Sequence, residues 1–180
     1  MFGRKKKIFY KNLQTETRES TSVPMLSFDI PGRLRCEVEH LVLDYNGTLA
    51  LDGTLLPGVG LVLKGLSDQL TVHVLTADTF GRSALELQGL PLTLSIVPAG
   101  SQDKHKKNYV EVLGAEHCIC IGNGCNDCLM LECAAVGIAV VQQECAAAAA
   151  VHSADIVAPD ILSALALLQN PLRMVATLRL

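Results

Sequence analysis

The chain has 180 residues, of which 49% are apolar and 18% are charged, the size and composition of an ordinary globular domain. Its net charge of −3 provides no general attraction to nucleic acid, so we expect no nucleic-acid partner. No stretch reaches the roughly 18 unbroken apolar residues of a membrane span. These properties predict a soluble protein without a membrane span.

Residues 1–23 have no apolar periodicity and carry a basic cluster, Arg4 to Lys7 followed by Lys11. The cluster is not followed by the apolar run that a secretory signal needs. We expect a solvated, flexible tail, with a weak contact to an anionic surface as the alternative. The remaining residues, 24–180, are predicted to form the functional domain.

Seven cysteines are present, and without a secretory signal they indicate a reducing compartment, so we expect a cytoplasmic location. Cys118 and Cys120 alternate along a predicted strand, and Cys125 and Cys128 lie near a predicted helix start. A zinc site built from these four is an alternative. The interpretation as small buried hydrophobes is favoured, because the strand pair points into the core and no histidine has supporting spacing.

Strand and helix patterns alternate along the chain. A hairpin is predicted around Pro31-Gly32 from residues 25–30 and 33–39, and residues 47–57 form a loop or small flap. The predicted strands after the hairpin are 40–44, 71–75, 92–97, 118–121, 137–141 and 155–158. The predicted helices are 59–70, 79–88, 103–113 with Gly114 as the C-cap, 126–134, 144–152, 160–169 and 172–178. This alternation predicts an α/β fold with a doubly wound, Rossmann-like parallel sheet.

Polar clusters follow three of the predicted strands: Asp44 to Thr48, Thr76 to Thr79, and Gly122 to Asp127. In doubly wound sheets, ligands bind outside the carboxyl ends of the strands. Because parallel strands end at one edge, the three clusters should lie together. They therefore mark a candidate site.

These clusters resemble the motifs of the haloacid dehalogenase superfamily. Residues 43–48, Leu-Asp-Tyr-Asn-Gly-Thr, match its first motif, Asp-x-Asp-Gly-Thr, with one change, and Thr76 matches the second. Lys106 matches the lysine of the third, and residues 122–127, Gly-Asn-Gly-Cys-Asn-Asp, resemble the fourth, Gly-Asp-Gly-x-Asn-Asp. Within the superfamily the chain is most similar to the soluble P-type ATPase-like phosphatases, over residues 28 to the C-terminus.

The resemblance implies a Mg²⁺-dependent phosphatase that works through an aspartyl-phosphate. Asp44 would be the nucleophile, while Thr76 and Lys106 would serve the transferring phosphoryl group together with Ala77 and Gly47. Mg²⁺ would be held by Asp44, Asn46, Asn123 and Asp127. Helix phasing alone leaves Lys104 and Lys107 as alternatives to Lys106.

Two departures from the motifs affect the chemistry. Asn46 stands where phosphatases of this superfamily place a general acid and base, and an amide cannot exchange that proton. Asn123 replaces the leading aspartate of the fourth motif, which predicts weaker Mg²⁺ binding. A catalytically impaired regulatory or binding module is therefore the alternative function.

The spacing between the motifs leaves no room for a cap domain, so the fold should be capless. An uncovered site cannot select a small substrate by enclosing it. A phosphorylated small molecule or a phosphoprotein is the expected partner, and a homo-oligomer is possible.

Overall fold

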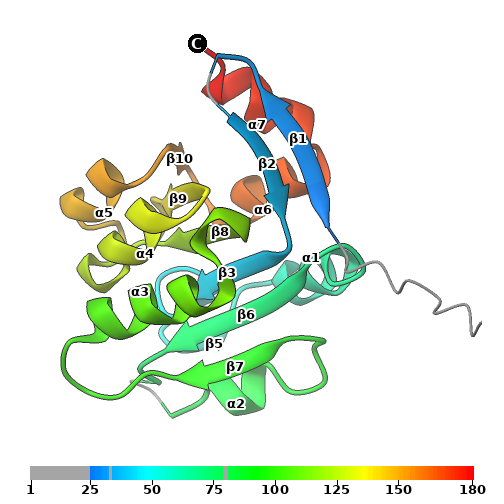
Figure 1. Cartoon of the computed structure of the whole chain (residues 1–180). Coiled ribbons are helices and arrows are strands. Elements are labelled where there is room, and N and C mark those ends of the chain that lie inside the picture. Colours follow the sequence, from blue (N-terminus) through cyan, green and yellow to red (C-terminus); the bar gives the residue numbers. More distant parts are fainter. Residues whose placement is uncertain (1–24, 33, 79–80) are drawn as a thin grey trace, which may run out of the picture.

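The computed structural model describes residues 25–32, 34–78 and 81–180. Within these residues the main sheet has six parallel strands in the order β10-β9-β8-β3-β6-β7 (Figure 1). The strands are β3 (His40–Asp44), β6 (Thr71–Thr76), β7 (Thr93–Ile96), β8 (Cys118–Gly122), β9 (Val136–Val140) and β10 (Ile156–Ala158). The predicted doubly wound α/β fold is confirmed.

Helices cover both faces of the sheet, as Figure 1 shows. One face carries α3 (Gln102–Leu113), α4 (Cys128–Cys133) and α5 (Ala148–Ser153). The other carries α1 (Val59–Leu66) and α6 (Ile161–Gln169), with the short α2 (Ser83–Glu86) at the β7 end, and α7 (Pro171–Leu178) packs against α6. Two short 3₁₀ turns, Ala115–His117 and Cys125–Asp127, precede β8 and α4.

Strand alternation divides the core in two. In β3, Leu41 and Leu43 point into the core shared with α1 and α6, whereas Val42 points into the core shared with α3 and α4. Cys118 and Cys120 lie in the second core as buried free thiols. Among the described residues no group of three or more His, Cys, Asp or Glu side chains could hold a metal ion. The interpretation as small buried hydrophobes holds for Cys118 and Cys120 and is wrong for Cys125, which is exposed, while Cys128 is half-buried.

Two small hairpins flank the sheet. The predicted N-terminal hairpin is confirmed as antiparallel β1 (Leu26–Ile30) and β2 (Leu34–Val38), which lies beside α7 (Figure 1). The predicted flap is present as the antiparallel pair β4 (Ala50–Leu51) and β5 (Thr54–Leu55). The Tyr45 hydroxyl donates to the Gly53 carbonyl at 3.0 Å and so ties the flap to the end of β3.

Four predicted helices are shorter than expected, and the one predicted over 126–134 is α4, because the residues before it form a 3₁₀ turn. The helix predicted over 144–152 begins only at Ala148, because Cys145 has a φ of 60° and the Ala147 amide donates to the Asn123 carbonyl instead of to a helical partner. Residues 79 and 80 of the helix predicted over 79–88 lie outside the described residues, and the rest forms only α2, whose start is bound by the Asp78 carboxylate. The helix predicted over 59–70 ends at Leu66.

Among the described residues, no single helix has the length and hydropathy needed to cross a membrane. Only α6 and α7 taken together reach those values, and their axes are bent by 103°. The predicted basic tail, residues 1–23, lies outside the described residues.

Candidate functional site

The topology brings the predicted site residues to one edge of the sheet. The chain runs from β3 outward through β6 to β7, then crosses back to β8 and continues to β10. The strand order therefore reverses between β3 and β8, where α/β sheets bind their ligands. Asp44 ends β3, Gly122 ends β8, and Thr76 lies one residue beyond the partner of Asp44 on β6.

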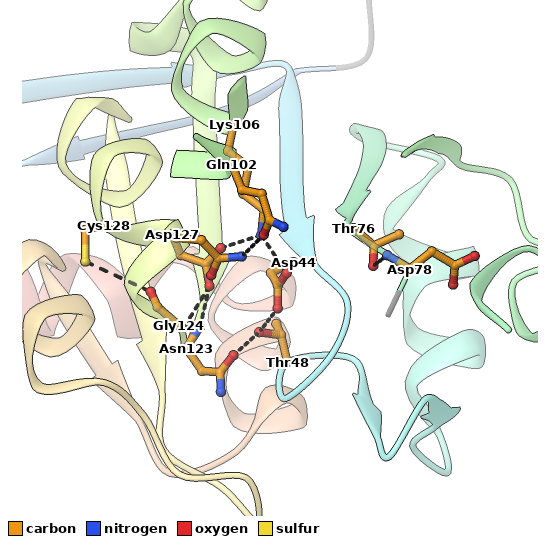
Figure 2. A network of polar contacts seen from close by, with 11 residues as sticks. Asp44, Thr48, Thr76, Asp78, Gln102, Lys106, Asn123, Gly124, Asp127 and Cys128 are labelled. Atoms are coloured by element: carbon orange, nitrogen blue, oxygen red, sulfur yellow. Dashed lines mark hydrogen bonds and ion pairs between the residues drawn. The ribbon is translucent and has the colours of Figure 1, made fainter. Parts of the chain in front are cut away.

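At this switch point Lys106 binds two carboxylates (Figure 2). Its ammonium donates to Asp44 Oδ1 and to Asp127 Oδ1, each at 2.6 Å. Lys106 and Asp127 are fully buried, and Asp44 is 6% exposed. Buried charges at this distance are held by mutual pairing, so the nucleophile candidate has one oxygen fixed by a cation.

The structure distinguishes the three lysines that the sequence left open. Lys106 lies on the same face of α3 as the buried Val110, four residues later. Lys104 is exposed, and Lys107 pairs with Glu111 at 3.6 Å on the outer face of the helix. Only Lys106 of the three reaches the switch point.

The carboxylate of Asp127 is hydrogen-bonded to the loop that precedes it. Its Oδ2 accepts from the amides of Asn123 and Gly124 at 3.0 and 2.8 Å, while Oδ1 accepts from Lys106. A β-carbon at Gly122 would lie 2.5 Å from Asp127 Cγ, so this approach requires glycine. These contacts favour a role in orienting Lys106 and the loop over the predicted role as a metal ligand.

Oxygen acceptors outnumber donors next to Asp44. The Thr48 hydroxyl lies 3.1 Å from Asp44 Oδ2 and 3.3 Å from Asn123 Oδ1, and its one proton can serve only one of them (Figure 2). The side-chain oxygen of Asn46 is also buried, and no other described residue hydrogen-bonds to it. Carboxylate and amide oxygens that lack donors are suitable ligands for a hard cation such as Mg²⁺. Asp44 and Asn123 therefore fit a metal, with Asp44 as the one carboxylate, and Asn46, two residues after Asp44 in the chain, would add its backbone carbonyl.

The predicted phosphate-binding residues lie around this cluster. The Thr76 hydroxyl accepts from the Asp78 amide at 2.9 Å, and among the described residues it makes no bond to Asp44. The carboxylate of Asp78 points away from Asp44 in Figure 2. Ala77, between them, is half-buried. Thr76 and Ala77 thus border the site from β6 without closing it.

Gly47 is constrained by the neighbouring loop. Its φ is 76°, and a β-carbon there would lie 2.3 Å from Asn123 Nδ2, so only glycine fits. The resemblance implied that Gly47 binds phosphate, and in the structure its amide donates to the Ala50 carbonyl at 2.9 Å. In this structure Gly47 shapes the turn after the nucleophile.

Burial and charge both act on the titration of the cluster. Burial, followed by the neighbouring Asp127 carboxylate, raises the pKa of Asp44 to about 6, against the opposing effect of Lys106. Burial alone would lower the pKa of Lys106, but the two carboxylates outweigh it and keep the pKa raised, so the ammonium stays protonated.

Sequence reasoning missed two residues that contact the site loops. Thr48 was part of the matched motif but received no role. Gln142 donates to the carbonyls of both Gly47 and Thr48. It directly follows the β9 region at the same edge of the sheet, so the strand-end rule that found the other clusters would have found it too.

No family model matches the chain. An uncharacterized protein of Methanocaldococcus jannaschii is 43% identical over an alignment of 84 residues, and the match covers 44% of this chain and 90% of that protein. The chain belongs to the same family as this archaeal protein. That relative is uncharacterized, so the match indicates no activity for this chain.

The solved structures similar to this chain share its fold. A haloacid dehalogenase superfamily hydrolase from Legionella pneumophila has a TM-score of 0.63 at 17% identity, covering 78% of this chain and 87% of its own. A 3-deoxy-D-manno-octulosonate 8-phosphate phosphatase from Moraxella catarrhalis has a TM-score of 0.57 at 18% sequence identity. The match covers 79% of this chain and 94% of that protein. A zinc-transporting PIB-type ATPase has a TM-score of 0.55 at 23% sequence identity, and the match covers 69% of this chain and 20% of the ATPase chain. The chain has the haloacid dehalogenase fold.

Proposed function

We propose that the protein is a Mg²⁺-dependent phosphohydrolase of the haloacid dehalogenase superfamily that forms an aspartyl-phosphate on Asp44. The observation that carries the proposal is the buried Asp44–Lys106–Asp127 cluster at the strand-order switch. Support also comes from the similar Moraxella phosphatase, which was solved with magnesium, phosphate and its sugar acid. Within the superfamily, we assign the protein to the soluble P-type ATPase-like phosphatases because its motifs resemble theirs.

Each residue of the cluster has a separate role in this proposal. Asp44, rigid at a strand end, attacks phosphorus in line and displaces the leaving oxygen of the substrate, which takes its proton from solvent; water then attacks the aspartyl-phosphate, releasing inorganic phosphate and regenerating Asp44. Lys106 neutralises charge on the phosphoryl oxygens, and the Thr76 hydroxyl donates a hydrogen bond to them. Asp127 orients Lys106 and the Asn123–Gly124 turn.

Asp44, Asn123 and the backbone carbonyl of Asn46 would hold Mg²⁺, which supplies charge neutralisation for the transferring group. The substrate would be a phosphorylated small molecule or a phosphoprotein, admitted to a capless site. We place the activity in the cytoplasm, in line with the seven free-thiol cysteines.

A regulatory or binding module is the second candidate, and the two asparagines favour it. Asn46 cannot exchange a proton with a leaving group or water, and Asn123 removes one negative charge from the donor set. Such a module would bind Mg²⁺ and phosphate without turning substrate over.

Hydrolysis of an aryl phosphate with and without Mg²⁺ tests the proposal. Asp44→Asn should lower kcat at least about a thousandfold because it removes the attacking oxygen. Asp68→Asn, at an exposed position outside the site, is the matched control and should be neutral. Equal hydrolysis by the Asp44 variant and the wild type would refute the nucleophile assignment. Wild-type protein that is stabilised by Mg²⁺ and beryllium fluoride but shows no turnover would identify the binding module.

A further inference from the structure

We propose that Gln142 is a positioning residue that fixes the loop after the nucleophile through the Gly47–Thr48 peptide. This inference rests on the proposed function, because its effect on catalysis requires Asp44 to be the nucleophile. Gln142 follows β9, nearly a hundred residues after the loop, and comes from a segment that no motif of the resemblance includes.

All hydrogen-bonding groups of the Gln142 amide are used. Its Nε2 donates to the Gly47 carbonyl at 2.9 Å and to the Thr48 carbonyl at 2.7 Å. Its Oε1 accepts from the Ile161 amide, the first residue of α6, at 3.0 Å. An amide can donate two hydrogen bonds and accept at its oxygen, so Gln142 links three backbone groups from two other segments of the fold.

The loop leaves those two carbonyls for Gln142. Its amides turn inward, since those of Thr48, Leu49 and Ala50 lie 3.2, 2.8 and 2.9 Å from the Tyr45 carbonyl. The carbonyls of Gly47 and Thr48 face the other way and meet Nε2. Loss of this donor group would leave two partly buried carbonyls without their side-chain partner, which favours rotation of the peptide between them.

Rotation of that peptide would disturb the nucleophile. The Thr48 hydroxyl lies 3.1 Å from Asp44 Oδ2 and 3.3 Å from Asn123 Oδ1. Gly47 packs against the Asn123 amide so closely that no β-carbon fits between them. The contacts of Gln142 therefore hold the residue that shares its proton with the attacking carboxylate, one step removed from the reacting atoms.

The neighbouring residue provides a matched control. Gln143 is exposed, and no hydrogen bond joins it to the loop among the described residues. Glu144, next in sequence, instead accepts from the Asp52 amide in the flap at 2.9 Å. The same substitution can therefore be made at Gln142 and at Gln143, with the contacts to the Gly47–Thr48 peptide as the difference.

Gln142→Glu retains an oxygen to accept from Ile161 but places a second acceptor against the two carbonyls. At saturating Mg²⁺ and with an aryl phosphate, we expect kcat to fall about 10- to 100-fold, with KM within about threefold of wild type. For Gln143→Glu, both kcat and KM should stay within about twofold of the wild-type values. Gln142→Met, neutral and of similar length, should show the same loss of kcat if the carboxylate prevents folding.

Amide hydrogen exchange gives a readout that does not depend on activity. Gln142→Glu or Gln142→Met should speed exchange at Thr48, Leu49 and Ala50 about tenfold or more, while the amides of β1 and β2 exchange as in wild type. Unchanged exchange of the loop would overturn the inference even if the wild type proved inactive. Normal kcat in both Gln142 variants, or a rise in KM alone, would also overturn it.

Discussion

The two ends of β3 each carry a buried polar cluster, and the clusters differ in kind. At the carboxyl end, Lys106 sits between Asp44 and Asp127, and oxygen acceptors exceed donors. At the amino end, His40 Nδ1 lies 3.2 Å from His73 Nε2, and His73 Nδ1 lies 3.0 Å from the Tyr109 hydroxyl. Both clusters are anchored on α3, which supplies Lys106 to one and Tyr109 to the other.

The difference shows how a structural polar cluster can be told from a reactive one. Both ring nitrogens of His73 have a partner, and burial followed by the charge of His40 lowers its pKa to about 4, so the cluster is neutral at pH 7. A neutral, satisfied network stabilises one packing arrangement. The Asp44 end keeps net charge and spare acceptors, which a folded protein tolerates where a ligand completes the site.

Removing Lys106, the cation between the two carboxylates, should have the largest effect on the stability of the protein. Lys106→Met leaves two buried carboxylates without their counter-ion, and we expect unfolding free energy to drop by about 3–5 kcal/mol in chemical denaturation. Lys107→Met removes a half-exposed pair with Glu111 on the same helix and should cost less than about 0.5 kcal/mol. Equal effects of the two substitutions would contradict the buried pairing of Lys106.

Acid should weaken the neutral end. Because the folded-state pKa of His73 is about 4 and its ordinary value is 6.5, the unfolded chain takes up a proton that the folded one excludes. Stability from His73 is complete above pH 6.5 and is lost as the pH falls toward 4, by up to about 3 kcal/mol. Denaturation of wild type and His73→Gln between pH 7 and 4.5 measures this, since the variant lacks the titrating ring.

His152→Gln is the control for that measurement, because His152 is exposed at the end of α5. Its pH profile should follow wild type, whereas the profile of His73→Gln should be flatter. Parallel profiles for wild type and His73→Gln would show that the histidine pair is not the acid-sensitive element.

The strands and the switch point could be predicted from sequence because they depend on short-range patterns. Apolar runs such as His40 to Asp44 recur at spacings that allow only a parallel sheet, and polar residues follow the same ends. The Cys118 and Cys120 alternation likewise placed both thiols in one core. Each of these inferences uses side-chain periodicity, which the fold preserves.

What could not be predicted depends on contacts between distant segments. The 144–152 region has strong helical composition, yet Asn123 captures the Ala147 amide and the Cys145 carbonyl, and the helix starts later. The choice of Lys106 over its neighbours required knowing which face of α3 meets β3. The strand-end pattern could have marked Gln142 as a site residue, but not its partner Gly47, which lies 95 residues earlier in the chain.

The smallest predicted effect concerns Asn46, whose buried side-chain oxygen has no hydrogen-bond partner in the part of the chain that the structure describes. Asn46→Asp puts a carboxyl group at a site where burial would raise its pKa and favour the protonated form. That group can protonate a poor leaving oxygen and then activate water against the aspartyl-phosphate. We expect kcat on an alkyl phosphate to rise about tenfold or more, and kcat on an aryl phosphate to rise less.

The ratio of the two rates is the decisive quantity, because an aryl leaving group needs little protonation. Whatever fraction of the new carboxyl group is ionised adds negative charge near Asp44 and strengthens Mg²⁺ binding, so all rates must be measured at saturating metal. Asn123→Asp is the matched control, since it adds the same charge on the far side of Thr48 without an acid in the nucleophile loop. It should leave the alkyl-to-aryl ratio unchanged. If Asn46→Asp also leaves that ratio unchanged, the missing acid is not what separates this site from other phosphatases, and the regulatory function gains support.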